Sequence, residues 1–389
     1  MSVPMHNLGA YQWATIQGST FAAAQIARHR WLGDRVEQAA ISFTAHGMLL
    51  YFFPNEQRMF DLQLSNWLAE LKKDGATARE IENAKNIAKD VVTKMLGRYA
   101  QSGVNTYVPF NGTWTPNGAA PPPGEYIPTP PRNLWPPAAP QARYASFYVL
   151  NRPTAAYRSR APPAIDSPEY AAFLDEIKAY GAAQGSIRTS EQSQIAQFHV
   201  EMPPPRFNRI LSTILQTQSP APSALDTAYY FALLNFAIAD ANTVTWDAKV
   251  HYNTWRPVTA IQHPSTWLHN KTRITDPTWM PLLNTPDHAE YLSGHSTLSG
   301  AATEVLKEIF KRDDVQFSVT YNATGYGSLT RRYNRFSEHA EEVAISRLYG
   351  GVHFRFANEV GSETGKRIGT EVVDGFKKNG WAKAFTGVL

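Results

Sequence analysis

The 389-residue chain, with a hydrophobic fraction of 43%, has the size and composition of one large or two coupled folded domains. It contains no cysteine, which excludes disulfides, a thiolate nucleophile and cysteine-ligated metal sites, so redox chemistry would need a cofactor that accepts oxygen and nitrogen ligands. The formal net charge is only +4 and the basic residues are scattered, which argues against a nucleic-acid binder.

The N-terminus, Met1 to Ala10, has neither the basic region nor the apolar region of a secretory signal. The longest apolar run, Ala228 to Ala239, contains Asn235 and is shorter than the roughly 20 residues that a membrane-spanning helix needs. We therefore expect a soluble protein that is either cytoplasmic or exported by a leader outside this sequence.

Residues from about Glu37 to Ala100 have the periodicity of helices. The clearest helix begins at Thr77, because Thr77 and Glu80 have the spacing of a capping box. The apolar residues that follow at helical spacing are Ile81, Ala84, Ala88, Val91, Val92, Met95 and Tyr99. They predict an amphipathic helix whose lysines face solvent.

The composition changes between Pro109 and Pro168, where more than half of the 27 prolines lie. Proline removes backbone donors and prevents long helices. This stretch is nevertheless rich in aromatic residues, unlike a disordered linker. The aromatic residues in it and just before it are Tyr107, Phe110, Trp114, Tyr126, Trp135, Tyr144, Phe147 and Tyr148. The sequence predicts an ordered, extended segment that wraps around the helices and forms part of the rim of a cleft.

Helix signals return at Ser167, at Thr189 with Gln192 three residues later, and at Arg206. The segment from Ala224 to Asp240 is apolar on nearly all sides, as in a central buried helix. Strand signals are sparse, so we predict an all-α, mainly helical fold.

We expect three parts that form one integrated fold. They are an N-terminal helical part (1–106), a wrapping segment rich in proline and aromatic residues (107–166), and a C-terminal part (167–389) that carries three short blocks of chemically interesting residues.

The first block is Lys249 with Arg256 and Pro257. Seven steps of about 100° return to nearly the same face of a helix, so both cations are expected to point into one cavity. Pro257 is expected to end or kink this helix and to hold Arg256 at its terminus. The alternative is a basic surface stripe, but neighbouring aromatic residues such as Trp246 indicate partial burial.

The second block, Ser293-Gly294-His295-Ser296, follows a turn-rich stretch and precedes a helical pattern from Thr297 to Phe310. It therefore lies at a helix N-terminus, where free N–H groups and the positive end of the helix dipole favour an anion. His295 can take up or deliver a proton near neutral pH. A simple N-cap role for Ser293 or Ser296 is the alternative, and the two roles are compatible.

The third block is Ser346-Arg347 with His353. A helix is expected over Glu338–Tyr349, and the glycine pair that follows breaks it before His353. Six steps along an unbroken helix would turn Arg347 and His353 to different faces, so the glycines let both reach one centre. Together the blocks supply cations, a hydroxyl, a backbone N–H and imidazoles, which are the donors that phosphate or vanadate requires. The blocks contain no matching cluster of carboxylates.

The order and internal spacing of the blocks resemble the signature of the vanadium-dependent haloperoxidase and type 2 phosphatidic acid phosphatase superfamily. That signature is Lys, six residues and Arg-Pro, then Pro-Ser-Gly-His, then Ser-Arg, five residues and His. Here Leu292 stands in place of the proline before Ser293, and the matching blocks cover about the last third of the chain. The stretches after Arg188 and around Asp247 are similar to the bacterial haloperoxidase-like branch.

The resemblance implies helical bundles of the same type and a bound vanadate, in a site that phosphate can also occupy. The equatorial oxygens of vanadate would be bound by Lys249, Arg256, Ser293, Gly294 and Arg347. His353 would be the axial vanadium ligand and His295 the acid/base residue, so these two histidines form the catalytic pair.

The resemblance also implies oxidation of a halide by hydrogen peroxide to hypohalous acid, followed by halogenation of a small organic acceptor. His288 matches a position where bromoperoxidases of the family tend to carry histidine, whereas Trp246 matches an aromatic residue near the halide site of chloroperoxidases. We therefore expect a halide or substrate pocket at Trp246 and His288, with bromide slightly favoured.

Three alternatives stay open at this point. An acid phosphatase would use His353 as the nucleophile and form a phosphohistidine, while His295 protonates the leaving group. A non-halogenating relative would rearrange an organic substrate by acid/base chemistry at His295, and a non-catalytic oxyanion binder would need neither step. Expected partners are peroxide, halide and acceptor rather than nucleic acid or a membrane, and a homodimer or higher homo-oligomer is compatible with this size.

Overall fold

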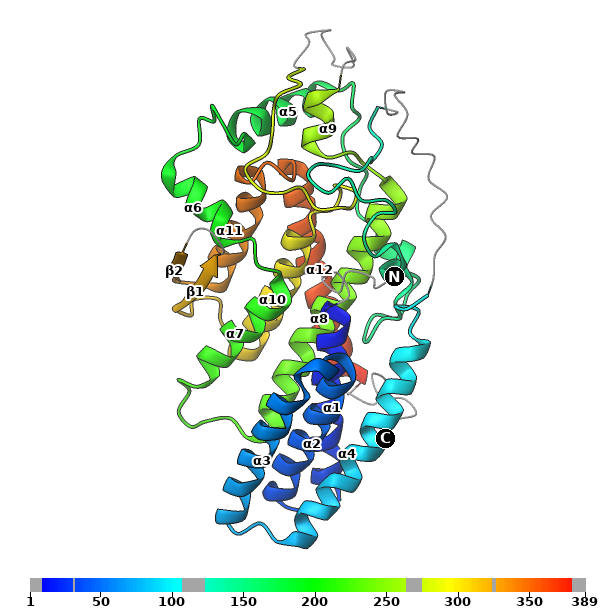
Figure 1. The fold of residues 1–389 in the computed structure, drawn as a ribbon, viewed down its shortest axis with the longest axis vertical. Helices are drawn as coiled ribbons and strands as arrows, with labels where there is room; N and C mark the ends of the chain where they lie inside the picture. The colour runs from blue at the N-terminus through cyan, green and yellow to red at the C-terminus, as the bar shows by residue number, and fades with distance from the viewer. Residues whose placement is uncertain (1–8, 31, 107–122, 264–274, 324–326, 380–389) are drawn as a thin grey trace.

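The structure, a computed structural model, describes residues 9–30, 32–106, 123–263, 275–323 and 327–379. The predicted all-α fold is confirmed (Figure 1). The helices are α1 (Gly9–His29), α2 (Asp34–Phe52), α3 (Gln57–Lys73), α4 (Ala78–Gln101), α5 (Pro168–Gly181), α6 (Ser190–Phe198), α7 (Pro203–Leu215), α8 (Ala224–Tyr252), α9 (Pro257–Gln262), α10 (Gly294–Phe310), α11 (Phe336–Tyr349) and α12 (Arg355–Asn379). Single 3-10 turns lie at Pro54–Glu56, Pro140–Tyr144 and Thr154–Tyr157. One antiparallel hairpin, β1 (Phe317–Ala323) and β2 (Gly327–Tyr333), pairs Phe317 with Tyr333.

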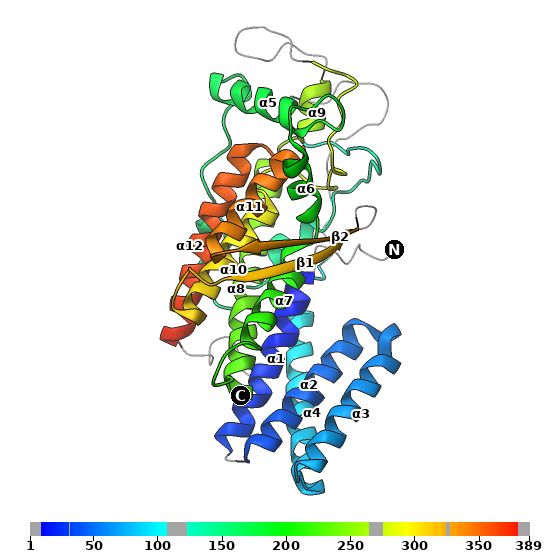
Figure 2. The same cartoon turned by 90° about the vertical axis from the view of Figure 1, so that its left-hand side faces the viewer.

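The molecule is elongated, with α1 to α4 at one end and α5 and α9 at the other (Figures 1 and 2). The 29 residues of α8 span about 43 Å at 1.5 Å per residue and connect the two ends. One continuous cluster of buried apolar side chains extends from Ala10 in α1 to Phe376 in α12. The predicted central helix is therefore present, and it extends twelve residues beyond Asp240 to Tyr252.

Helices α10 and α12 pack with their backbones in contact because α12 carries glycine at every fourth position, Gly361, Gly365 and Gly369. A Cβ atom added to Gly365 would lie only 2.0 Å from the carbonyl oxygen of Thr297 in α10. No side chain fits in that space, so glycine is required for this close approach. The packing holds the N-terminus of α10 beside the start of α12, where the second and third blocks lie.

The predicted helix after Thr77 is present as α4, with the capping box formed. The Glu80 carboxylate accepts from the Thr77 N–H at 2.7 Å, and the Thr77 hydroxyl accepts from the Glu80 N–H at 3.2 Å. A second capping box joins Thr189 and Gln192 at the start of α6, as predicted. Sequence periodicity did not predict α1, because this helix is buried over most of its surface and is rich in small residues.

The extended segment is ordered over residues 123–166, as predicted, and two aspartates of α8 hold it in place. Asp240 accepts the backbone N–H groups of three consecutive residues, Tyr148, Val149 and Leu150, at 2.7 to 3.0 Å. Burial raises the pKa of Asp240 to about 6. Two turns further along α8, Asp247 forms ion pairs with Arg143 and Arg158. The predicted aromatic residues Tyr107, Phe110 and Trp114 lie outside the described residues.

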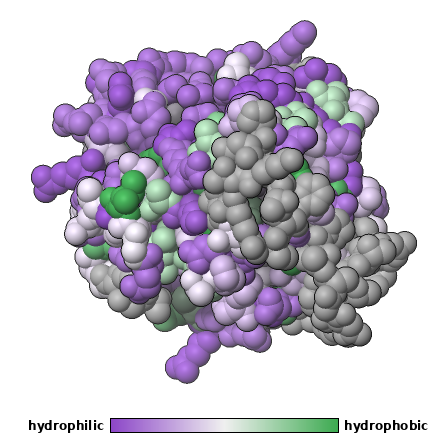
Figure 3. Space-filling model, turned by 90° about the horizontal axis from the view of Figure 1, so that it is seen from above, coloured by the Kyte–Doolittle hydropathy of each residue, from purple (hydrophilic) through white to green (hydrophobic). Residues whose placement is uncertain are grey.

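None of the helices in the described part of the chain combines the length and apolar character needed to cross a bilayer. Viewed from the end that carries α5 and α9, the surface is mainly hydrophilic with small, scattered apolar areas (Figure 3).

Candidate oxyanion site

The first block lies on two helices rather than one. Helix α8 ends at Tyr252 because Asn253 adopts the left-handed conformation with φ of 45°, which asparagine tolerates better than most residues. Arg256 is the N-cap residue of α9, and Pro257 is the first residue of that helix. The prediction of a shared helix face ended by Pro257 is therefore wrong, but the connection still brings Lys249 and Arg256 into one buried region.

Lys249 extends from α8 to the segment before the second block. Its ammonium group donates to the carbonyl oxygens of Ala289, Glu290 and Leu292 at 2.8, 3.0 and 2.5 Å. The side chain is buried, and burial together with the charge of Arg256 holds the pKa of Lys249 well below its usual value. Lys249 therefore fixes the shape of this segment as well as supplying positive charge.

Arg256 is fully buried and joins the same segment to the third block. Its Nε donates to the carbonyl oxygen of His288 at 2.8 Å, and one terminal nitrogen donates to the carbonyl oxygen of Val352 at 2.7 Å. Its terminal nitrogens also lie 2.9 Å from His288 Nδ1 and 3.2 Å from His353 Nε2. Burial lowers the pKa of Arg256 to about 10, so the guanidinium remains charged at neutral pH.

The second block forms the N-terminus of α10, as predicted. Ser293 occupies the N-cap position, but its hydroxyl makes no capping hydrogen bond. It lies 3.0 Å from the Ser296 hydroxyl, which is 3.3 Å from Asn358 Oδ1 of α12. Gly294 is the first residue of the helix, so its N–H has no intrahelical acceptor. The block therefore presents a hydroxyl and a backbone N–H at the positive end of a helix dipole.

The glycine pair separates α11 from α12 in the third block, as predicted. Gly350 caps α11, and Gly351 has φ of 75° and lies so close to Gly181 that a Cβ atom would be 2.4 Å from the Gly181 carbonyl oxygen. Arg347 donates to the carbonyl oxygen of His199 at 3.2 Å, and its Nε has no hydrogen-bond partner among the described residues. Burial and the charge of Arg256 lower the pKa of Arg347 to about 9.

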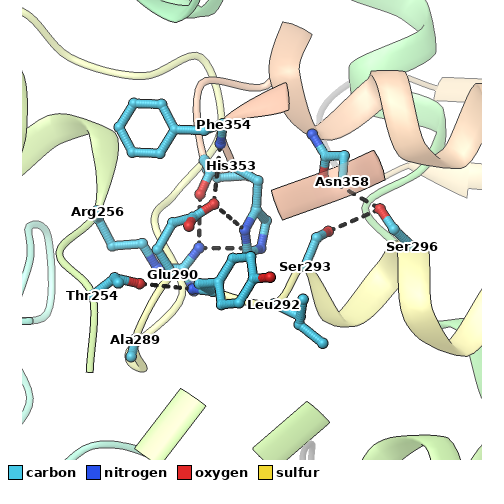
Figure 4. A network of polar contacts seen from close by, with 12 residues as sticks. Thr254, Arg256, Ala289, Glu290, Leu292, Ser293, Ser296, His353, Phe354 and Asn358 are labelled. Atoms are coloured by element: carbon cyan, nitrogen blue, oxygen red, sulfur yellow. Dashed lines mark hydrogen bonds and ion pairs between the residues drawn. The ribbon is translucent and has the colours of Figure 1, made fainter. Parts of the chain in front are cut away.

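The imidazole of His353 lies between the carboxyl group of Glu290 and the guanidinium group of Arg256, as Figure 4 shows. Its Nδ1 lies 2.9 Å from Glu290 Oε1, while its Nε2 faces Arg256 at 3.2 Å. Arginine can only donate, so Nε2 carries the lone pair and Nδ1 carries the proton. Burial, Arg256 and Lys249 lower the pKa of His353, so its imidazole is neutral. A neutral imidazole with Nε2 unprotonated is the form that can bind a metal or attack phosphorus.

Glu290 is the site residue that the sequence reasoning missed. It is completely buried, its Oε1 also accepts the Phe354 N–H at 3.1 Å, and its backbone N–H donates to the Thr254 carbonyl. Burial raises the pKa of Glu290 to about 7, while Arg256 and Lys249 act in the opposite direction. The available signal was an isolated acidic residue in the apolar run from Ala289 to Leu292.

A cavity of about 350 Å³ opens beside these groups. Six of the predicted residues line it, namely Trp246, Lys249, His288, Gly294, His295 and His353. Arg256, Ser293 and Arg347 are not among its lining residues, but Arg256 contacts two residues that are. The rings of Trp246 and His288 meet edge to face with centroids 5.0 Å apart. The two residues predicted to form a halide pocket therefore lie side by side in one wall of the cavity. The extended segment contributes Pro131, Arg132 and Ala138, as expected for part of a cleft rim.

His295 faces this cavity from the first turn of α10. Its Nε2 is buried and has no hydrogen-bond partner among the residues described. Burial, followed by the charge of Arg347, lowers the pKa of His295, whereas a hydrogen bond with the Glu201 backbone opposes that shift. His295 is therefore neutral at neutral pH and can accept a proton.

Three comparisons with known proteins bear on the family of the chain. Residues 229–379 match the family model described as the VCPO second helical-bundle domain. The vanadium chloroperoxidase of Curvularia inaequalis is 25% identical over 205 residues. That alignment covers 39% of this chain and 33% of the fungal protein, so the match spans about a third of the relative's length.

Solved structures match over nearly the whole chain. A structure described as the first bacterial vanadium-dependent iodoperoxidase has a TM-score of 0.74 at 25% identity and covers 94% of this chain and 90% of its own. Holo and apo structures of a bacterial vanadium-dependent chloroperoxidase have TM-scores of 0.70 and 0.74 at 16% and 15% identity. They cover 97% and 99% of this chain and 93% and 95% of their own, and at this identity they show the shared fold. Residues 229–379, which contain all three blocks, therefore belong to the vanadium-dependent haloperoxidase and type 2 phosphatidic acid phosphatase superfamily, and the structures that share the fold of the whole chain are bacterial vanadium-dependent haloperoxidases.

Proposed function

We propose that this chain is a vanadate-dependent haloperoxidase, an oxidoreductase that uses hydrogen peroxide to oxidise a halide to hypohalous acid and so halogenates a small organic acceptor. The observation that carries the proposal is the neutral imidazole of His353. Its unprotonated Nε2 lies among buried cations, and Glu290 holds its Nδ1 proton. An anionic centre that accepts one nitrogen ligand matches this arrangement.

The residues present fit vanadate in charge and in hydrogen-bonding groups. Arg347 Nε and His295 Nε2 are buried polar atoms without partners among the described residues, so both are available to an oxyanion. Lys249 and Arg256 supply charge but are hydrogen-bonded to protein atoms, and the Arg256 nitrogen must move away from His353 Nε2 before that atom can become a ligand. When bound, vanadate supplies a Lewis acid that activates peroxide without changing its own oxidation state.

The chain's own residues perform three tasks in this proposal. Lys249, Arg256 and Arg347 balance the negative charge of the oxyanion, and the Gly294 N–H and Ser293 hydroxyl bind its oxygens. Glu290 keeps His353 in the tautomer that offers Nε2. Nε2 of His295 accepts a proton from hydrogen peroxide that enters the cavity and returns it in a later step.

Bromide is the first halide candidate because His288 lines the cavity beside Trp246, and bromoperoxidases of the family tend to carry histidine at this position. Iodide is the second, since the relative at 25% identity is described as an iodoperoxidase. The apolar wall near His295, formed by Leu298 and Met202, suits a small phenol-type acceptor.

A phosphatase is the competing function, because the same donors bind phosphate and the same Nε2 of His353 can attack phosphorus. The geometry of His353 serves either chemistry, so the reaction must be tested directly.

The test is reconstitution with orthovanadate, followed by addition of hydrogen peroxide, bromide or iodide, and a phenol-type acceptor. The proposal expects halogenation that requires vanadate and disappears in His353→Ala, while the exposed His251→Ala serves as a matched control that retains activity. Hydrolysis of a phosphate ester by the wild-type protein, with no halogenation under any halide, would overturn it.

A further inference from the structure

Arg206 in α7 is a buried cation outside the three blocks. It is 1% exposed and lies between two aromatic rings, with its guanidinium carbon 4.4 Å from the Phe198 centroid and 5.5 Å from that of Tyr321 in β1. Burial lowers the pKa of Arg206, so placing a charge there has a cost that its partners must offset.

All three guanidinium nitrogens of Arg206 form hydrogen bonds with one short segment, residues 198–201. The guanidinium donates to the Phe198 carbonyl oxygen at 2.6 Å, to His199 Nδ1 at 3.0 Å and to the Glu201 carboxylate at 3.2 Å. His199 is fixed at its other nitrogen by Glu342 of α11 at 2.9 Å. This segment joins α6 to α7 and has no regular structure of its own over residues 199–202.

The backbone of the same segment contacts two residues of the oxyanion site. The His199 carbonyl oxygen accepts from Arg347, and the Glu201 backbone hydrogen-bonds the ring of His295. Arg347 has no other partner described for its guanidinium, and His295 Nε2 has none. The orientation of both side chains therefore depends on where these two peptide groups are held.

We propose that Arg206 is a positioning residue for the oxyanion site, which acts by holding the 198–201 segment so that its carbonyl groups aim Arg347 and His295 at the ligand. The inference rests on the proposed function only in assigning Arg347 and His295 to oxyanion binding. Outer residues that orient ligands typically contribute about 10- to 100-fold to affinity or activity.

The chain offers a matched control in Arg209, one turn along α7. Arg209 pairs with the same Glu201 carboxylate at 2.5 and 2.6 Å, but its side chain is 47% exposed and it has no described contact with the segment's backbone. Arg209→Met therefore removes a charge and an ion pair at the same carboxylate without releasing the peptide groups.

The experiment measures orthovanadate and phosphate affinity by titration calorimetry, without peroxide or halide, and the tautomer of His295 by nitrogen-15 NMR. Arg206→Met is expected to weaken oxyanion binding about 10- to 100-fold and to convert His295 from one tautomer to a mixture, whereas Arg209→Met changes affinity by less than about threefold. Loss of packing alone would not change the tautomer, and circular dichroism checks that each variant is folded.

Arg206→Lys keeps the positive charge and one hydrogen-bonding nitrogen. This variant tests the positioning role of residue 206 if Arg206→Met does not fold. It should show a partial loss of affinity and a partial tautomer change. Wild-type affinity and a single His295 tautomer in the folded Arg206 variant would overturn the inference. If the wild-type protein bound neither oxyanion, the proposed function would fail, while the His295 spectrum would still test Arg206.

Discussion

The glycine contact between α10 and α12 makes a sharp prediction about how the site is held together. In Gly365→Ala, the added Cβ would lie 2.0 Å from the Thr297 carbonyl oxygen, where ordinary contact is 3.4 Å or more. The two helices must therefore move apart by up to about 1.4 Å, the difference between these two distances. Neither backbone can rotate away as a flexible side chain would.

Overpacking of this kind costs typically about 1–3 kcal/mol, and replacing a helical glycine by alanine returns about 0.5–1 kcal/mol. We therefore expect Gly365→Ala to lower the free energy of unfolding by about 1–2 kcal/mol. The displacement also separates the second block from His353. A shift of about 1 Å can reduce activity by roughly 100-fold, so vanadate-dependent turnover should fall even where the protein is folded.

Gly97→Ala in α4 is the matched control, because nothing lies within 4 Å of the position where its Cβ would be. It should raise the free energy of unfolding by about 0.5–1 kcal/mol and leave activity unchanged. Urea denaturation of both variants, with vanadate affinity measured in parallel, is the assay. If Gly365→Ala were as stable as Gly97→Ala and bound vanadate like the wild type, the reasoning about this helix contact would be refuted.

Three further predictions concern single buried side chains. Glu290→Ala removes the acceptor for His353 Nδ1 and should weaken vanadate binding, measured by calorimetry, about 10- to 100-fold. Glu290→Gln retains an acceptor oxygen and should lose less affinity. Equal losses of affinity in the two variants would contradict a positioning role for Glu290. Lys249→Met leaves three carbonyl groups without their donor and should lower the free energy of unfolding by at least about 1–3 kcal/mol, so unchanged urea stability would count against the structural role. Burial raises the pKa of Asp240 from 3.8 to about 6, so the folded protein holds this proton more tightly than the unfolded chain does. The free energy of unfolding, relative to that of Asp240→Asn, should be greatest below about pH 4 and fall by about 3 kcal/mol by pH 7. If this difference in the free energy of unfolding did not change with pH, the raised pKa would be excluded.

The local features of the fold could be predicted because each depends on residues close together in sequence. The capping box at Thr77 and the helix that begins after Ser293 were both visible as short patterns. The break at Gly350 and Gly351 was also visible, since a glycine pair inside a helical pattern has few other uses. These predictions needed no knowledge of tertiary contacts.

The parts that failed depend on contacts that the sequence does not display. Arg256 lies outside α8 because one residue, Asn253, enters the left-handed region, and periodicity alone cannot show this. Glu290 acts on His353, which lies 63 residues away, and the His199 carbonyl acts on Arg347 across 148 residues. Helix α1 has buried residues on nearly all sides, so it lacks the amphipathic pattern that identified α4.

The central claim is that the three blocks form one oxyanion site with His353 as the ligand of vanadium. The most direct measurement is a crystal structure of the protein soaked in orthovanadate, with anomalous scattering data collected at the vanadium edge. We predict one vanadium peak at bonding distance from His353 Nε2, with Arg347, Ser293 and Gly294 around it and with Arg256 moved away from that nitrogen. A vanadium peak elsewhere, or an oxyanion in this cavity that leaves His353 Nε2 bonded only to Arg256, would contradict the account.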